Sequence, residues 1–187
     1  RPTPITPEAK VAAAANPGYY IAGWTDENKE DLGTGIAPAF GELQYSEDQI
    51  FTVSFAEKAD VYIKYIAEEH GRVSNDGESL APATGTAEGS VATPDTGYHF
   101  TGWYRNGEQV GEDLKFVPGR NADGIYETAT YVARFAPDET TRYTVEFYYE
   151  NHGEYPEEAD LTSIRQGTTD TEVSVTDLDK QPVRPDY

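Results

Sequence analysis

The sequence predicts a mostly β protein made of tandem copies of a small module, with little helix. Residues 97–103 read GYHFTGW and residues 18–24 read GYYIAGW, and these copies contain both tryptophans of the chain. They begin 97 − 18 = 79 residues apart. Around both copies, short segments alternate apolar and polar residues, which is typical of half-buried strands. A repeated motif of this kind indicates the organisation of the chain before any single element is assigned.

Other landmarks recur at nearly the same distance. Phe51–Ala56 is similar to Tyr131–Ala136 at an offset of 131 − 51 = 80, and Val61–Tyr65 is similar to Tyr143–Phe147 at an offset of 143 − 61 = 82. A slow drift of the offset is expected when loops vary in length and strands are kept. We therefore divide the chain into three segments: the C-terminal part of a first repeat (residues 1–57), a complete second repeat (58–137) and the N-terminal part of a third (138–187).

The first segment begins with prolines in residues 1–7, which predict an extended entry. Glu8–Ala15 has the composition of a helix, but its counterpart Gly89–Pro94 does not, so this stretch is either a short helix or extended. Gly18–Trp24 is a predicted strand, with Tyr19, Ile21 and Gly23 on one face and Tyr20, Ala22 and Trp24 on the other. Residues 25–35 form a predicted loop and residues 51–55 a closing strand.

The complete segment opens with the strongest predicted strand, Val61–Ile66, whose residues 61, 63 and 65 share one face. Residues 68–89 are polar and predict a long loop with a turn at Asn75–Gly77. A strand over residues 98–104 follows, then a hairpin turn at the Asn106–Gly107 pair, a short extended piece at 114–118 and a closing strand at 131–135. The third segment repeats the opening strand at 143–149, followed by a polar connection and a final extended stretch, Val173–Val175.

The repeated motif supplies the candidate structural site. The two tryptophans occupy equivalent positions, as core residues do, and a small module gains most of its stability from burying large rings. The glycine before each tryptophan leaves room for the indole to lie against backbone. We therefore expect a repeat core around one set of residues: Trp24, Trp103, Tyr19, Tyr98, Gly23 and Gly102.

With these motifs in hand, the chain resembles the Listeria–Bacteroides repeat, also called the internalin B-repeat. The matching pieces are the opening strand Val61–Tyr65, the motif Gly97–Tyr104 and the closing strand Tyr131–Phe135. The third segment, from Tyr143 on, also looks like the mucin-binding-protein-like repeats of bacterial adhesins. The resemblance implies small β-grasp-like modules strung in tandem on Gram-positive surface proteins as stalk, spacer or adhesive segment. It implies no catalytic residues.

Composition narrows the partners. The net charge is −20, which argues against nucleic acid and anionic membrane surfaces, because phosphate groups are bound by basic faces. The chain has no cysteine, which excludes disulfides, thiolate metal sites and cysteine nucleophiles. No stretch is long and apolar enough to span a membrane, and no signal peptide is visible in residues 1–7. We expect an extracellular, cell-surface or cell-wall location and a monomeric fragment.

No constellation of residues predicts catalysis or a cofactor. Nucleophile and phosphate-loop motifs are missing, and adjacent acidic pairs arise by chance among 34 acidic residues. His70 and His152 are equivalent positions, each before a glycine, so they indicate turns, whereas His99 lies in a predicted strand. Calcium could use loops such as residues 75–78 or 121–124, but solvated turns explain the same residues better. We therefore expect no enzyme, no cofactor and no metal site.

The sequence thus predicts a non-enzymatic tandem-repeat segment of a bacterial surface or secreted protein that acts as a stalk or adhesion module. A host protein or glycan is the partner it would take if it binds one. The alternative is a carbohydrate- or mucin-binding module, appended in one variant of this hypothesis to a secreted glycan-degrading enzyme. Exposed tyrosines gathered in one patch would favour binding over a stalk.

Overall fold

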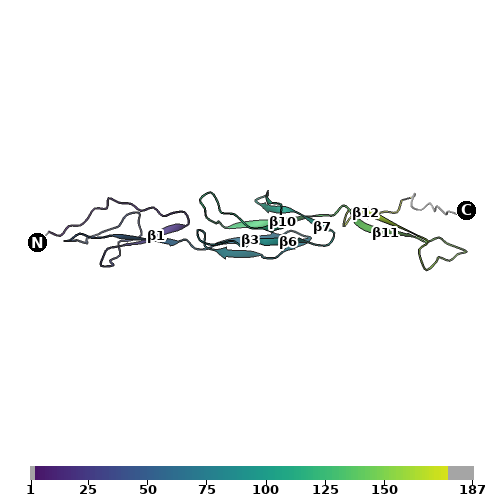
Figure 1. The fold of residues 1–187 in the computed structure, drawn as a ribbon, viewed down its shortest axis with the longest axis horizontal. Coiled ribbons are helices and arrows are strands. Elements are labelled where there is room, and N and C mark those ends of the chain that lie inside the picture. The colour runs from purple at the N-terminus through teal and green to yellow at the C-terminus, as the bar shows by residue number, and fades with distance from the viewer. Residues whose placement is uncertain (1–2, 177–187) are drawn as a thin grey trace. The chain divides into compact units, whose positions relative to one another are not determined.

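The computed structural model describes residues 3–176, and positions 1–2 and 177–187, including the end of the third segment, lie outside the described residues. The described chain is all β and contains no helix, which confirms the mostly β prediction (Figure 1). None of its elements is a helix that could cross a bilayer. The strands, in chain order, are β1 (Tyr19–Thr25), β2 (Thr52–Glu57), β3 (Val61–Ala67), β4 (Gly71–Val73), β5 (Gly77–Leu80), β6 (Ser90–Pro94), β7 (Tyr98–Arg105), β8 (Glu108–Gly111), β9 (Lys115–Phe116), β10 (Ala129–Pro137), β11 (Thr141–Phe147) and β12 (Leu161–Gly167).

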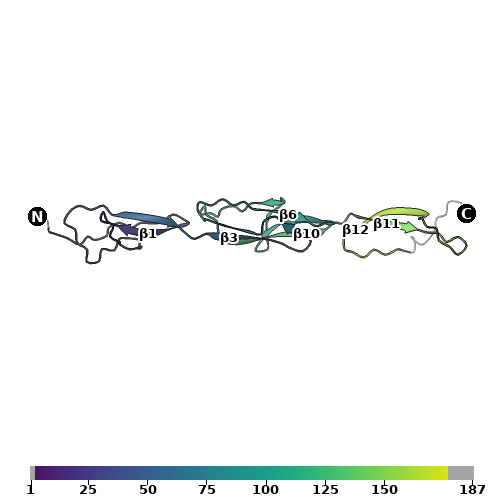
Figure 2. The ribbon, with the colours of Figure 1, turned by 90° about the horizontal axis from the view of Figure 1, so that it is seen from below.

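These strands form four sheets. β1 pairs with β2, and β11 pairs with β12, each as an antiparallel pair (Figure 2). A five-stranded sheet has the order β5-β3-β10-β7-β8, and a three-stranded sheet has the order β4-β6-β9. By compactness the chain divides into two units. The first runs to Tyr65 and includes Asn75–Ser90 and Phe116–Tyr131, and the second holds Ile66–Ser74, Val91–Lys115 and the chain from Val132 on.

The contacts between β3 and β10 show that these two strands run in the same direction. The Tyr62 amide donates to Thr128, and the Tyr65 ring stacks on Tyr131 with 6.1 Å between ring centres. Farther along, the Glu68 amide donates to the Ala133 carbonyl at 2.9 Å. Residue numbers rise together on both strands, so the pair is parallel.

Both copies of the motif contain a β-bulge at the same place. In β1, Ile21 pairs with Phe55 and Gly23 with Ser54, so Ala22 is an extra residue. In β7, Phe100 pairs with Phe135 and Gly102 with Arg134, so Thr101 is the extra residue. An extra residue shifts the alternation by one position.

Because of the bulge, the prediction that Ile21 and Trp24 point to opposite faces is wrong. Ile21 packs against the buried cluster of Trp24, Leu32 and Phe40. In β7 the Phe100 ring meets Trp103 edge-on, with 6.2 Å between ring centres. The bulge thus turns the apolar residue and the tryptophan of each motif to the same side.

Several strands lie where the sequence predicted loops. β4 and β5 lie inside the polar stretch 68–89, and β12 lies inside the connection that follows the opening strand of the third segment. These short strands are rich in polar residues, and β5 and β12 are held by backbone pairing to the stronger strands β3 and β11. Val173–Val175, predicted to be extended, belongs to no strand.

The N-terminal stretch Glu8–Ala15 has no regular secondary structure, so of the two alternatives that the sequence left open the helix does not form. The Ala13 amide donates to the Ile36 carbonyl at 2.7 Å, and Ala13 packs against the Trp24 cluster. Tertiary contacts therefore override the helix propensity of the alanine run.

The opening strand of the third segment begins two residues earlier than predicted. β3 begins at Val61, and β11 begins at Thr141, an offset of 141 − 61 = 80. His70 and His152 keep their offset of 82, and both have positive φ, 72° and 56°. Two additional residues therefore lie between β11 and His152.

Candidate functional site: the segment junctions

The six residues expected in the repeat core lie in two separate places. Trp24 is 5% exposed in the cluster of the first segment, and Trp103 is fully buried in the central segment. Their indole nitrogens donate to the Gly35 carbonyl at 2.9 Å and to the Leu114 carbonyl at 3.2 Å. Each ring therefore has its one polar atom satisfied inside its own segment.

The tyrosines and glycines of the motif are less uniform than the tryptophans. Tyr19 and Tyr98 are half-buried, and each pairs with the last residue of the closing strand, Glu57 or Pro137. This places both tyrosines at the point where one segment passes into the next. The structure thus brings the tryptophans into cores and the tyrosines to the segment junctions.

Gly23 and Gly102 have different roles despite their equivalent positions. A Cβ on Gly23 would have Ser54 Oγ as its nearest neighbour at 3.9 Å, which is an ordinary contact. Gly102 has a φ of 151°. A Cβ on Gly102 would lie 2.5 Å from the side-chain nitrogen Nε2 of Gln109 and 3.1 Å from the Gly111 carbonyl oxygen. Of these two glycines, only Gly102 has a backbone conformation that requires glycine.

We therefore expect Gly102→Ala to destabilise the protein by more than 1 kcal/mol, because it combines a strained φ with a steric overlap. Gly23→Ala is the matched control, and it should be neutral or stabilising by up to about 1 kcal/mol, since alanine restricts the unfolded chain. Urea denaturation of both variants measures the difference. Equal stabilities would contradict the distinction.

The two junctions are built in the same way. Three residues separate β2 from β3, and three separate β10 from β11. The first residue after each closing strand donates its amide to the glycine that opens the motif: Lys58 to Gly18, and Asp138 to Gly97, both at 2.8 Å. The next segment is therefore hydrogen-bonded to the previous one at its first residue.

Both opening glycines allow a loop of the following segment to approach. Gly18 and Gly97 have φ of 83° and 86°. A Cβ on Gly18 would lie 2.9 Å from the Ala83 Cβ, and a Cβ on Gly97 would lie 2.9 Å from the Thr169 side chain. Any other residue at these two positions would be strained and would push the loop away.

At the first junction a carboxylate holds that loop. Glu57 Oε1 accepts hydrogen bonds from the amides of Ala83 at 2.6 Å and Thr84 at 2.9 Å, and Oε2 accepts one from the Thr84 hydroxyl at 2.7 Å. The Thr84 hydroxyl, the two amides and the charge of Arg120 lower the pKa of Glu57 against the opposing effect of burial. Glu57 is therefore ionised at neutral pH, and its bonds weaken only as the pH falls through the lowered pKa.

Arg120 fixes the loop that Glu57 binds. Its guanidinium donates to the carbonyls of Pro82 at 3.2 Å, Ala83 at 2.5 Å and Gly85 at 2.6 Å. The same group lies over the Tyr126 ring, 4.6 Å from its centre. A guanidinium carries five N–H donors in a planar fork, which suits a set of converging carbonyls that lysine could not match. Arg120 thus shapes the receiving surface for Glu57.

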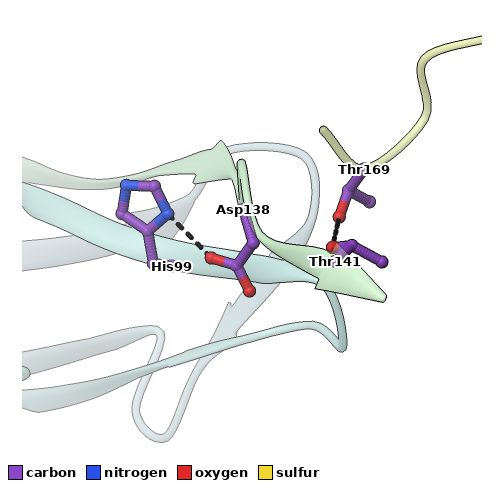
Figure 3. Close-up of polar contacts among 4 residues, drawn as sticks. All are labelled: His99, Asp138, Thr141 and Thr169. Carbon is purple, nitrogen blue, oxygen red and sulfur yellow. Dashed lines mark hydrogen bonds and ion pairs between the residues drawn. The ribbon is translucent and has the colours of Figure 1, made fainter. Parts of the chain in front are cut away.

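The second junction reaches the same result with other side chains (Figure 3). Asp138 links the two sides: its carbonyl accepts from the Thr169 amide, and its carboxylate lies 2.9 Å from His99 Nδ1. The hydroxyls of Thr141 and Thr169 are hydrogen-bonded at 2.5 Å. The loop after β12 is therefore tied to the strand that opens its own segment and to the closing end of the previous one.

At this junction Tyr98 binds the loop of the following segment, as Glu57 does at the first junction. Its hydroxyl donates to the Asp170 carboxylate, and this bond together with burial raises the pKa of Tyr98 to about 12. The phenol therefore stays protonated at neutral pH, and its contribution is lost only as the pH rises through that value. The Tyr98 ring also stacks on His70, with 4.0 Å between ring centres. Pro137 occupies the position that Glu57 has at the first junction. The acidic group here is Asp170, which belongs to the loop.

Sequence reasoning missed most residues of both junctions. Glu57 and Thr84 are 27 residues apart, and His99 and Asp138 are 39 apart, so no local pattern connects them. One signal was present: the opening glycines Gly18 and Gly97 recur with the motif, and a repeated glycine indicates positive φ or a close approach.

The loops considered for calcium use their oxygens internally. Asn75 Oδ1 accepts from the Gly77 amide, and Asn121 Oδ1 accepts from the amides of Asp123 and Ile125.

The Glu78 carboxylate accepts hydrogen bonds from the Tyr65 hydroxyl at 2.6 Å and from two backbone amides. Burial alone would raise the pKa of Glu78, but these bonds lower it. Within residues 3–176 no three acidic or histidine side chains gather as metal ligands would.

One comparison with known proteins finds a similarity over part of the central segment. Residues 61–123 match the model of the divergent InlB B-repeat domain. The match begins at the first residue of β3 and includes the GYHFTGW motif, the hairpin β7–β8 and β9. Searches of the curated proteins and of the solved structures gave no significant match. The central part of this chain is thus similar to a divergent InlB B-repeat domain, a kind of repeat associated with bacterial surface or secreted proteins.

Proposed function

We propose that the chain is a non-enzymatic tandem-repeat segment of a bacterial surface protein and that it acts as a stalk. The observation that supports this role is the doubled junction. A stalk must hold each module in a fixed orientation relative to the next. Each junction here has a three-residue linker, a hydrogen bond from an amide to the opening glycine, and a bound loop. Short linkers with several cross-contacts restrict hinge motion, whereas flexible linkers leave it free.

The alternative is an adhesion module that binds a glycan through exposed aromatic rings. Among the tyrosines of residues 3–176, four are more than two-fifths exposed: Tyr20, Tyr62, Tyr148 and Tyr155. Tyr20 is in β1 and Tyr62 in β3, and the other two follow β11. Because they belong to three different segments, we favour the stalk. Binding of the intact chain to a glycan array, lost when Tyr155 becomes alanine, would favour adhesion.

The stalk role predicts a narrow distance distribution across the first junction. The chain has no cysteine, so the double variant E42C/D123C, at two exposed sites, can be spin-labelled without background. We expect electron-spin resonance to give one narrow distance peak at neutral pH. Glu57→Ala should broaden that peak, because it removes the three hydrogen bonds to residues 83 and 84.

Glu27→Ala is the matched control, since it removes an exposed acidic side chain from the first segment away from the junction. It should leave the peak width unchanged. A broad distribution in the parent double variant, equal to that of the Glu57→Ala variant, would show that the junction is a free hinge and would count against the stalk.

A further inference from the structure

The two junctions place their carboxylate on opposite sides of the contact. At the first junction the acid is Glu57, the last residue of β2, and the loop supplies the donors, which are the amides of Ala83 and Thr84 and the Thr84 hydroxyl. At the second junction the acid is Asp170 in the loop, and the preceding segment supplies the donor, which is the Tyr98 hydroxyl. The hydrogen bonds to the carboxylate therefore run in opposite directions at the two junctions.

At the end of each segment, two paired residues occupy the position from which these contacts are made. Glu57 ends β2 and pairs with Tyr19, and Pro137 ends β10 and pairs with Tyr98. In the first pair the closing strand supplies the group that binds the loop, and in the second pair the motif tyrosine supplies it. A segment can therefore present either an acceptor or a donor from the same place in the fold.

The two loops also contact the preceding segment at equivalent residues. A Cβ on the first opening glycine would lie 2.9 Å from the Ala83 Cβ, and one on the second opening glycine would lie 2.9 Å from the Thr169 side chain. The next residue of the loop is Thr84 at the first junction and Asp170 at the second. These two residues therefore correspond, and one carries a hydroxyl donor where the other carries a carboxylate.

The first loop has both the donors and the charge of a carboxylate-binding surface. The Arg120 guanidinium donates to carbonyls of this loop, among them those of Ala83 and Gly85, so a positive charge is fixed beside it. That charge is one of the factors that lower the pKa of Glu57. Hydrogen bonds to a charged group are about twice as strong as those between neutral groups. The loop therefore favours a preceding segment whose end presents an acid.

A mismatched pair would bring incompatible groups together. The Thr84 hydroxyl lies 2.7 Å from a Glu57 oxygen. An acidic residue at that loop position would face Glu57 with a second carboxylate, and two carboxylates repel each other and have no proton to donate. In the opposite mismatch, Tyr98 and Pro137 would face a loop with threonine, and the bond to the charged Asp170 would be lost. Rejection of a wrong partner contributes to specificity as attraction to the right one does.

We propose that the junctions are selective interfaces between repeats, in which one side supplies a carboxylate and the other side supplies its donors. The end of the first segment, which presents Glu57, fits a donor loop such as residues 83–84 and rejects an acidic loop. The end of the central segment, which presents Tyr98, fits an acidic loop such as the one that carries Asp170. The partner of each surface is thus another repeat of defined polarity. This inference rests on the proposed stalk role, because matched ends matter only where segments are held in a fixed orientation.

The spin-labelled double variant E42C/D123C reports on the first junction in the full chain. Thr84→Asp should lose the narrow distance peak at neutral pH, because it sets two carboxylates against each other. Glu57→Ala should lose it as well, because the loop donors then have no acceptor. The two substitutions together should restore the narrow peak, since the Tyr19 hydroxyl then donates to the new carboxylate, as the equivalent tyrosine does at the second junction.

Two further variants show whether the restored peak comes from this exchange of polarity. Thr84→Asn is the matched control for Thr84→Asp, since its side chain has the same shape but keeps N–H donors for Glu57, and it should leave the peak narrow. Tyr19→Phe should have no effect on the peak of the parent double variant, where Glu57 binds the loop. In the combined Glu57→Ala and Thr84→Asp variant, the same Tyr19→Phe change should remove the narrow peak again.

The outcomes separate this inference from the stalk role. A narrow peak in the parent with a broad peak in the combined variant would overturn the inference and leave the stalk role standing. A narrow peak in Thr84→Asp alone would also overturn it, because the junction would then tolerate two facing carboxylates. A broad peak in the parent would count against the stalk itself, and matched junctions would fall with it.

Discussion

Trp103→Ala should destabilise the central segment by about 3–5 kcal/mol, the cost of replacing a fully buried aromatic side chain by alanine. The side chain of Trp103 has no exposed surface, and its indole nitrogen is hydrogen-bonded to Leu114. The variant also leaves the edge of Phe100 against a cavity. Because a small domain has a total stability of about 5–15 kcal/mol, this loss is enough to unfold a marginal module.

The measurement can follow each segment separately, because the chain has two tryptophans. In Trp103→Ala, fluorescence of Trp24 reports the first segment, which should unfold at nearly the parent denaturant concentration. In Trp24→Ala, fluorescence of Trp103 reports the central segment, which should be close to the parent. If Trp103→Ala kept full stability and instead lost binding to a glycan array, the assignment of this residue to a core would be wrong.

Lys58–Pro137 should fold when it is expressed alone, with one cooperative transition. All strands of the five-stranded and three-stranded sheets, β3 to β10, lie within this range. It also contains Trp103, Tyr65 and the other buried residues around β3 and β10. A module that retains its whole core loses only the junction contacts on excision.

The comparison fragment is Gly18–Glu69, which tests whether the repeat boundaries lie half a repeat away. It contains β1 and β2 but only one strand of the five-stranded sheet. We expect narrow amide-proton dispersion from this fragment and wide dispersion from Lys58–Pro137. The opposite result would move the boundaries, and the third segment from Asp138 on should be disordered by itself in either case.

The strong strands could be predicted from the sequence because their alternation is set by burial on one face. β3 shows this best, since Ile63 and Tyr65 are buried on one face and Tyr62 and Lys64 are exposed on the other, which keeps the predicted division between the faces. The Asn106–Gly107 turn was equally predictable, because both residues have positive φ and this pair favours it. The mostly β class followed from such elements.

There is a physical reason why neither the bulges nor the junctions could be predicted from the sequence. Ala22 and Thr101 are ordinary strand residues, and only the pairing with the closing strand shows that each is extra. The binding of Glu57 to Thr84 depends on how Arg120 arranges the loop carbonyls, which is a property of the folded chain. β5 and β12 were missed because their polar residues do not alternate clearly, and backbone pairing stabilises them.

The parallel pairing of β3 and β10 has a mechanical consequence. The chain enters the central segment at the start of β3 and leaves it at the end of β10, which are opposite ends of a parallel pair. Tension between the neighbouring segments would therefore pull the two strands past each other along their length. In that direction the load is shared by all the hydrogen bonds of the pair, whereas an antiparallel hairpin pulled at its open end loses its bonds one after another. Under such tension, this pair of strands would resist extension better than a hairpin that is pulled at its open end.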